Sequence, residues 1–287
     1  MPEESKTGAL AGQRALVIGA SSGIGMSSAG LLLADGADVT IAGRTEERLR
    51  EAADSLRQSA PEGAGRLEWT LCDGMVVEDV RRAVDLAGGN AGLDIAVTIP
   101  GGNASFCPVL GLSEEDFEST VAHNLRPQFL VLKYAGLSMV GSGGGSIVAI
   151  SSTAAIMTSR YLAGYCASKA AVDQLVRVAA DELGEARVRV NAVRPGLTRT
   201  GGTGGLFEAE PILNRFLTEQ PIPVGGEPEF IAKAVRFLAG PESGWVTGQC
   251  LTVDAGHTLR KFPDLTEMTK HAFGPERWEA LFRGELT

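Results

Sequence analysis

Short apolar runs alternate with longer amphipathic stretches along most of the chain. Strands buried on both faces of a sheet appear as continuous apolar runs, whereas helices packed on one show apolar residues every three or four positions. The alternation therefore predicts an α/β fold with a doubly wound, seven-stranded parallel sheet. The predicted strands are Arg14–Ile18, Asp38–Ala42, Arg66–Thr70, Ile95–Thr98, Ser146–Ile150, Val188–Val193 and Cys250–Val253.

Amphipathic stretches predict the helices between these strands. One of them contains Pro127, and because proline has no backbone N–H to donate, that helix is expected to bend or restart there. The glycine-rich stretch at positions 141–145 predicts a tight turn into the next strand, with a flexible linker as the alternative. The predicted helices are Gly23–Ala34, Glu46–Arg57, Val76–Ala87, Glu114–Met139, Tyr161–Leu183 and Pro228–Ala239.

The chain length favours one large domain with an appendage. A chain of 287 residues is long for one ordinary domain and short for two complete ones. We expect an N-terminal tail at residues 1–11, a Rossmann-like domain at 12–260 and a C-terminal extension at 261–287. In the extension, Trp278, Leu281 and Phe282 have helical spacing, which predicts packing on the same or a neighbouring subunit. Closing the active site is the alternative role.

Composition and charge narrow the classes of partner. A net charge of -9 repels phosphate backbones and anionic lipids, so neither nucleic acid nor a membrane is an expected partner. The polar N-terminus lacks the apolar core of a signal peptide, and no run approaches the ~18 apolar residues of a spanning helix, which predicts a cytoplasmic protein. The 4 cysteines are far apart and the 3 histidines have no metal-like spacing, so no metal site is predicted.

A glycine-rich segment directly follows the first predicted strand and opens the first helix. Its G-x-x-x-G-x-G spacing allows the backbone to turn sharply and approach a pyrophosphate, whose charge the helix N-terminus meets. A turn that is merely tightly packed is the alternative. A P-loop is excluded because Met26 stands where that motif needs lysine. The residues predicted to contact the cofactor here are Gly19, Ser21, Ser22, Gly23, Ile24 and Gly25.

The end of the second strand bears on the choice of cofactor. A carboxylate there accepts hydrogen bonds from a ribose 2′-hydroxyl, whereas an arginine pairs with a 2′-phosphate. This strand ends Ala42-Gly43-Arg44, with no acid. We therefore predict that Arg44 gives a preference for NADP(H), with NAD(H) also possible. The alternative is a solvated arginine paired with Glu46 or Glu47.

Tyr165 and Lys169 are candidate proton-transfer residues. Four positions apart on a predicted helix, they project from one face. A phenol ordinarily loses its proton near pH ~10, and an adjacent ammonium favours the phenolate. Such a pair also arises by chance as a packed ring beside a solvated lysine. The context favours catalysis, because Ser152 follows a strand at the carboxyl edge of the sheet, where doubly wound folds bind ligands.

With these motifs the chain, from about Gly12 to Arg260, resembles the short-chain dehydrogenase/reductase family. The resemblance implies that Tyr165 protonates the carbonyl oxygen as hydride arrives, that Ser152 holds that oxygen, and that Lys169 also contacts the ribose. By the same resemblance Asn124 anchors a water in the proton relay, and Asp73 contacts the adenine. Without the resemblance, Asn124 is a helix asparagine at a break before Pro127, and Asp73 is a turn residue beside Gly74.

The resemblance also covers the last third of the chain. The turn Asn191-Ala192-Val193-Arg194-Pro195-Gly196 looks like the one beside the nicotinamide in that family, and Thr200 matches the residue that binds the carboxamide. Pro195, Gly196, Thr198 and Thr200 are thus expected to contact the cofactor. In related proteins the region of the last strand commonly forms a subunit interface, so the resemblance also implies a homotetramer or homodimer. Residues Thr200–Gln220 are interpreted as a glycine-hinged lid, with an ordinary surface loop as the alternative.

Two motifs depart from the family pattern. Thr98-Ile99-Pro100-Gly101 stands where members commonly have Asn-Asn-Ala-Gly, and Ile18 replaces the usual threonine before the first glycine. These changes affect the support of the cofactor more than the proton-transfer groups. Gly101 is still expected to contact the cofactor.

The predicted function is an oxidoreductase that interconverts a carbonyl and a secondary alcohol with NAD(P)(H). The alternatives are a non-catalytic dinucleotide-binding regulator and a 3-oxoacyl-carrier reductase. The first has no need of Tyr165, and the second lacks a basic docking surface, since only Arg126 and Lys133 follow Asn124 on that helix. The presumed pocket predicts a mainly apolar small-molecule substrate and comprises Asn103–Pro108, Thr153–Leu162 and Leu197–Phe216.

Overall fold

The computed structural model describes residues 8–103 and 106–285. Its seven strands form one parallel sheet in the order β3-β2-β1-β4-β5-β6-β7, which confirms the predicted fold class. Every predicted strand is present, with ends that move by two residues at most. The strands are β1 (Arg14–Ile18), β2 (Asp38–Gly43), β3 (Leu67–Leu71), β4 (Ile95–Thr98), β5 (Gly145–Ile150), β6 (Val188–Pro195) and β7 (Cys250–Val253).

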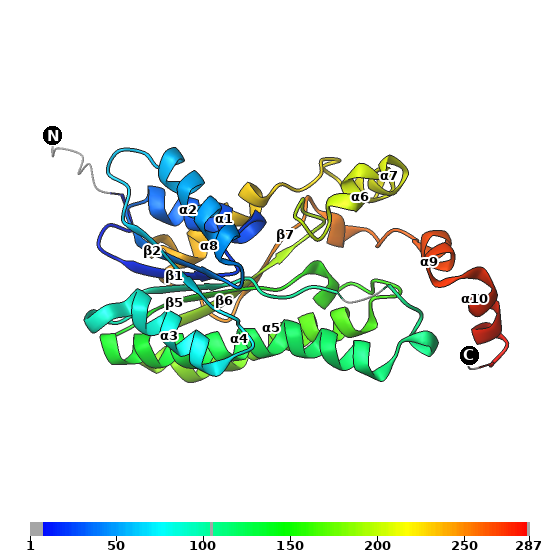
Figure 1. Ribbon diagram of the computed structural model, residues 1–287, viewed down its shortest axis with the longest axis horizontal. Coiled ribbons are helices and arrows are strands. Elements are labelled where there is room, and N and C mark those ends of the chain that lie inside the picture. Colours follow the sequence, from blue (N-terminus) through cyan, green and yellow to red (C-terminus); the bar gives the residue numbers. More distant parts are fainter. Residues whose placement is uncertain (1–7, 104–105, 286–287) are drawn as a thin grey trace.

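Helices cover both faces of the sheet, with α1, α2 and α8 on one side and α3, α4 and α5 on the other (Figure 1). Two short helices follow β6, and two more lie beyond β7 at the C-terminus. The helices are α1 (Gly23–Ala34), α2 (Glu46–Ser59), α3 (Val77–Gly88), α4 (Glu114–Ser142), α5 (Ala163–Leu183), α6 (Gly204–Glu208), α7 (Glu210–Thr218), α8 (Pro228–Ala239), α9 (Thr266–Phe273) and α10 (Pro275–Phe282).

The alternation of side chains along β1 divides the interior into two cores. Ala15 and Val17 belong to the core under α1, α2 and α8, whereas Leu16 and Ile18 belong to the core under α3, α4 and α5. Successive strand residues point to opposite faces, so a strand buried on both sides must be apolar throughout. Leu10, within the predicted tail, is also fully buried in the first core.

The carboxyl ends of β1 and β4 mark the topological switch point of the sheet. β1 pairs with β2 on one side and with β4 on the other, both in parallel register. The connections leave β1 and β4 in opposite directions, and ligands of doubly wound folds bind in the crevice that this reversal opens. The glycine-rich segment and the residues after β4 both lie at this edge.

The predicted helices differ from the observed ones at Pro127 and Tyr161, and the ends of α2, α3 and α4 move by one to three residues. The predicted restart at Pro127 does not occur, because α4 continues through that proline, which lies buried inside the helix. One missing donor is tolerated where the flanking turns keep their hydrogen bonds and packing. The helix predicted from Tyr161 begins at Ala163, because Tyr161 adopts a left-handed backbone conformation with φ of 71°. The predicted tight turn at 141–145 is confirmed, with Gly143 in the left-handed conformation after α4.

Candidate active site

Tyr165 and Lys169 lie on α5, one turn apart and at the carboxyl end of β5. The Lys169 Nζ is 5.7 Å from the centroid of the Tyr165 ring. Lys169 is only 2% exposed, and its Nζ donates a hydrogen bond of 2.9 Å to the carbonyl of Ile150, the last residue of β5. This lysine is therefore a buried, fixed cation rather than the solvated side chain of a chance pair.

Ser152 is the third member of this group and lies just beyond the end of β5. Its Oγ accepts a hydrogen bond of 3.1 Å from the backbone N–H of Ala154, which holds the serine in the turn. Burial raises the pKa of the Tyr165 phenol above its ordinary value, and a hydrogen bond with the Ser152 side chain partly opposes this increase. The two hydroxyl groups are thus neighbours, as a shared contact with a substrate oxygen requires.

Burial also perturbs the lysine. Desolvation lowers the pKa of Lys169 to about 8, and the negative charge of Asp173 opposes this decrease. A buried cation in a low-dielectric environment loses its proton more readily unless an anion or a hydrogen bond stabilises the charge. Perturbed titratable groups that converge at one sheet edge are characteristic of functional sites.

Asn124 is fully buried on α4 and binds the segment after β4. Its Oδ1 accepts from the N–H of Gly102 at 3.1 Å, and its Nδ2 donates to the Gly102 carbonyl at 2.6 Å. A Cβ added to Gly101 would lie 2.5 Å from Asn124 Oδ1 and 3.1 Å from Lys169 Nζ. The backbone at Gly101 therefore links α4 to Lys169. The alternative of an asparagine at a helix break is wrong, since α4 has no break there.

The unusual segment after β4 is held by Gln128, which the sequence reasoning missed. Gln128 is fully buried, one turn beyond Asn124, and its Nε2 donates to the Pro100 carbonyl at 3.1 Å. A Cβ on Gly19 would lie 3.0 Å from Ile99 Cβ, so the segment also packs on the glycine-rich turn. A second polar residue at helical spacing from Asn124 was the available signal.

The glycine-rich turn has the backbone that a dinucleotide requires. Gly19 and Gly23 have left-handed φ values of 87° and 53°, and a Cβ on Gly25 would lie 2.2 Å from the Gly19 carbonyl oxygen. Ser22 precedes α1 without capping it through its side chain, which leaves the N–H groups of the first turn open to an anion. Ser21 and Ile24 lie in the same turn.

Arg44 is exposed at the carboxyl end of β2. Within the part of the chain that the structure describes, no carboxylate forms an ion pair with it, and Glu46 pairs instead with Arg50 at 2.6 Å. Glu46 is therefore not the partner that the alternative reading required. Asp73 is half-buried after β3, and its Oδ1 accepts from the N–H of Met75 at 2.9 Å, so it does shape the turn there.

The residues after β6 form a threonine network. Thr198 Oγ1 donates to the Gly196 carbonyl at 3.0 Å, next to Pro195, the last residue of β6. The N–H of Thr200 donates to Thr203 Oγ1 at 2.9 Å, and a Cβ on Gly23 would lie 3.4 Å from the Thr200 methyl group. Thr200 thus adjoins the glycine-rich turn. Thr203 was not singled out from the sequence.

The C-terminal extension packs on its own chain beside the start of α5. The Tyr161 hydroxyl is 2.7 Å from Thr266 Oγ1 on α9, and the Tyr161 ring meets Trp278 on α10 edge to face at 5.5 Å. A Cβ on Gly111 would lie 2.6 Å from the Phe273 ring. The extension therefore contacts the segments before α4 and before α5. Of the predicted pocket segment 103–108, Ala104 and Ser105 lie outside the described residues.

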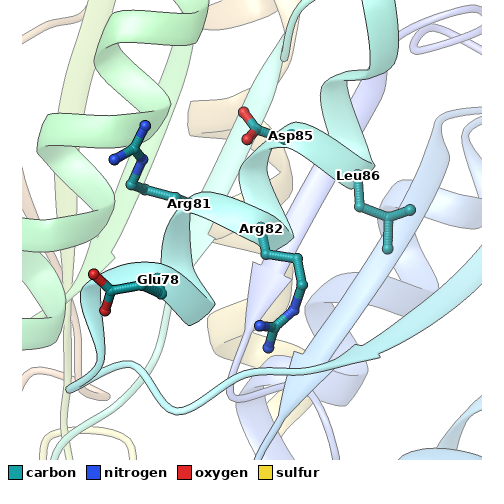
Figure 2. A pocket seen from close by; sticks show the side chains of 5 residues that line it. All are labelled: Glu78, Arg81, Arg82, Asp85 and Leu86. Atoms are coloured by element: carbon teal, nitrogen blue, oxygen red, sulfur yellow. The ribbon is translucent and has the colours of Figure 1, made fainter.

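An open hollow on the outer side of α3 is separate from these residues. Figure 2 shows it between exposed charged side chains of a single helix, where Arg82 pairs with Asp79 at 2.7 Å. None of the predicted site residues lines it. Its lining consists of Glu78, Arg81, Arg82, Asp85 and Leu86.

Residues 8–103 and 106–285 contain neither a cluster of metal ligands nor a membrane-spanning helix. No group of three or more histidine, cysteine, aspartate or glutamate side chains is placed to hold a metal ion. No helix is both long and apolar enough to span a membrane.

Comparisons with known proteins agree with the geometry. A family model described as enoyl-(acyl carrier protein) reductase matches residues 19–258. The A-factor type gamma-butyrolactone 1'-reductase (1S-forming) of Streptomyces virginiae is 36% identical over 260 residues, covering 88% of this chain and 98% of that protein.

Solved structures share the fold. A short-chain type dehydrogenase/reductase from Mycobacterium ulcerans superposes with a TM-score of 0.89 at 36% identity, covering 93% of this chain and 97% of that one. A 7 alpha-hydroxysteroid dehydrogenase complexed with NADH and 7-oxo glycochenodeoxycholic acid gives 0.80 at 31% identity, covering 86% and 94%.

Proposed function

This chain belongs to the short-chain dehydrogenase/reductase family and is an NAD(P)-dependent carbonyl/alcohol oxidoreductase, and from this premise we propose that Ser152, Tyr165 and Lys169 are its catalytic residues. The single observation that carries the proposal is their convergence at the carboxyl end of β5. Lys169 is buried with Nζ 5.7 Å from the Tyr165 ring, and the Ser152 side chain is near enough to the phenol to lower its pKa by hydrogen bonding.

This geometry indicates the path of the proton. In reduction, Tyr165 gives its phenolic proton to the developing alkoxide, and Ser152 donates a hydrogen bond to the same oxygen. Lys169 stabilises the phenolate that remains, because its ammonium is held one turn away. Asn124 fixes the backbone at Gly102 behind the lysine and is a positioning residue. In oxidation the same groups act in reverse.

The glycine-rich turn fits the cofactor. The approach of Gly25 to the Gly19 carbonyl leaves no room for a side chain, and the open N-terminus of α1 suits a pyrophosphate. When bound, the nicotinamide supplies or accepts the hydride. We assign its surroundings to Gly101, Pro195, Gly196, Thr198 and Thr200, and the adenosine end to Asp73 and Arg44.

We assign NADP(H) as the preferred cofactor. The support is Arg44, an exposed guanidinium that no described carboxylate neutralises, at the position where a 2′-phosphate is recognised. Gly43 adds no side chain that would fill this space.

The substrate is a small, mainly apolar carbonyl compound. The segment after β6 contributes two buried aromatic side chains, Phe207 and Phe216, to the proposed substrate pocket. Tyr161 and Trp278 flank the start of α5. An acyl carrier is the poorer candidate because Arg126 already donates to the Met75 carbonyl and Lys133 lies over the Tyr134 ring. These two cations are not arranged as a docking surface for an acidic protein.

A screen of ketones against both cofactors tests this function. Uncharged ketones, lactones with a side-chain ketone and oxo-steroids are incubated with NADPH or NADH, and nicotinamide absorbance is followed. We expect turnover of at least one class, faster with NADPH, and turnover that is lower by about 10³-fold or more in the Tyr165→Phe variant. Turnover near the wild-type rate in this variant would refute the assigned mechanism, and a clear preference for NADH would refute the cofactor assignment.

We further assign a homotetramer or homodimer as the assembly. Phe129, Leu137 and Val140 are exposed apolar side chains on α4, and Trp245 before β7 is 100% exposed. Apolar surface of this kind on two separate faces is typical of subunit interfaces. Light scattering of wild type and Leu137→Lys tests the assignment, which a monomeric wild type would contradict.

A further inference from the structure

A buried ion pair lies directly behind the catalytic pair on α5. Asp173 follows Lys169 by four residues, as Lys169 follows Tyr165, so the three side chains share one face of the helix. Asp173 is 3% exposed and Arg194 is 8% exposed. The Arg194 Nη2 is 2.7 Å from Asp173 Oδ2, and its Nε donates to the same oxygen at 2.8 Å.

The two partners connect three elements of the site. Arg194 is the next-to-last residue of β6, and its Nη1 donates to the Cys250 carbonyl on β7 at 3.3 Å. Arg194 Nε and Nη2 both contact Asp173 Oδ2, whereas Asp173 Oδ1 accepts no hydrogen bond from any residue that the structure describes. In a buried, low-dielectric environment a charge acts on neighbouring charges more strongly than it does in water.

We propose that Asp173 is a positioning residue that keeps Lys169 in its ammonium form, and that Arg194 in turn holds the Asp173 carboxylate in place. The inference rests on the proposed function, in which the ammonium stabilises the Tyr165 phenolate. The carboxylate acts through space across one helical turn, since no contact within 4.0 Å joins it to Lys169.

The other groups that face this cluster do not supply the same charge. Tyr165 is a neutral phenol whose pKa burial raises, and burial and the Asp173 charge raise the pKa of the Cys250 thiol to about 11. Toward Lys169, α4 presents the uncharged Asn124 through Gly101, and β5 presents the Ile150 carbonyl. Arg177, on the same helix as Asp173, is exposed and donates to Gln174, so solvent screens its charge.

Loss of the Asp173 charge would change the protonation of the buried Lys169. Burial lowers the pKa of Lys169 to about 8, and Asp173 opposes that decrease. Removing the carboxylate charge therefore lowers the lysine pKa further, so that Lys169 is neutral over more of the working pH range. The unpaired Arg194 left behind adds to the effect in the single Asp173→Asn variant.

A titration that needs no substrate tests this directly. Lysines are labelled with ¹³C at Cε, the Lys169 signal is assigned with Lys169→Arg, and its midpoint is followed by NMR against pH. In Asp173→Asn the midpoint is expected to fall by about one pH unit or more. Asp173→Glu keeps the charge and should stay closer to wild type. Asp181→Asn, the same change at an exposed position of α5, should have no effect.

The double variant Asp173→Asn/Arg194→Gln provides a second test in case the single variant does not fold. It removes both members of the buried pair and leaves no unpaired charge. Its Lys169 midpoint should still fall, though less than in Asp173→Asn. A midpoint that equals wild type in whichever of the two variants is folded overturns the proposal.

A kinetic measurement gives an independent readout. With the most active ketone of the panel and NADPH, the alkaline limb of the reduction rate should move to lower pH in Asp173→Asn. The rate should equal wild type near pH ~6, where Lys169 is protonated in both proteins, and fall about tenfold near pH ~9. An equal loss at all pH values would show a merely structural role. A wild type without any turnover would contradict the proposed function, not the titration.

Discussion

Lys169 and Arg44 are both cations that we assign to the cofactor, yet their surroundings differ. Lys169 is 2% exposed, donates to the Ile150 carbonyl and lies near the Asp173 charge. Arg44 is exposed and forms no ion pair within the described parts of the chain. A buried charge must have its partners in place before any ligand arrives, whereas an exposed charge stays solvated until the ligand replaces the water. The surroundings of Lys169 are therefore organised before a ligand binds, whereas those of Arg44 are not.

Substitution of Tyr165, beside the buried Lys169, should have the largest effect on turnover. Tyr165→Phe removes the phenolic proton while it keeps the ring packed, so we expect turnover to fall by about 10³-fold or more. Steady-state kinetics and NADPH binding by fluorescence titration measure the two effects separately. Tyr134→Phe, on α4, is the matched control and should retain full activity. Equal losses in the two variants would contradict the role of Tyr165.

The glycine-rich turn should show the next largest effect. In Gly25→Val, a Cβ would lie 2.2 Å from the Gly19 carbonyl oxygen, so the turn must open and NADPH binding should weaken by about 100-fold. Gly30→Ala on the same helix is the control, because its Cβ would meet only the Leu56 side chain, at 3.1 Å. Calorimetric titration with NADPH distinguishes them. Unchanged affinity in Gly25→Val would place the dinucleotide elsewhere.

Arg44 should affect selectivity without affecting chemistry. In Arg44→Gln the charge-assisted bond to a 2′-phosphate is lost, so we expect kcat/KM for NADPH to fall about 10- to 100-fold and that for NADH to stay nearly unchanged. Arg48→Gln, exposed one turn away, is the control. An equal loss with both cofactors would show that Arg44 does not read the phosphate.

The smallest effect is expected in the C-terminal extension. Trp278→Ala removes the edge-to-face contact with Tyr161, which contributes about 1 kcal/mol. We expect KM for the ketone to change a few-fold while kcat and NADPH affinity remain, because the contact lies before α5, at the proposed substrate pocket, and not at the glycine-rich turn. Phe237→Ala, an exposed aromatic of α8, is the control. No change in KM would limit the extension to a structural role.

Local patterns were sufficient to predict the elements and the candidate site residues. Apolar runs located the inner strands because strands buried on both faces exclude most polar side chains, and the alternation of elements located the partly exposed edge strands β3 and β7. Tyr165, Lys169 and Ser152 were predicted because helical spacing and strand ends fix which residues share a face or an edge. Gln128 and Thr203 were missed because their importance depends on the carbonyl groups that they reach, and no spacing rule names those.

By itself the sequence determined the fold class and predicted the glycine-rich turn and the Tyr165–Lys169 pair, since these depend on periodicity and short-range geometry. Only the tertiary structure decided that α4 continues through Pro127, that Tyr161 joins the C-terminal extension, and that Asp173 pairs with Arg194. These contacts join residues far apart in the chain. Packing around a shared core brings them together, and no local pattern encodes that.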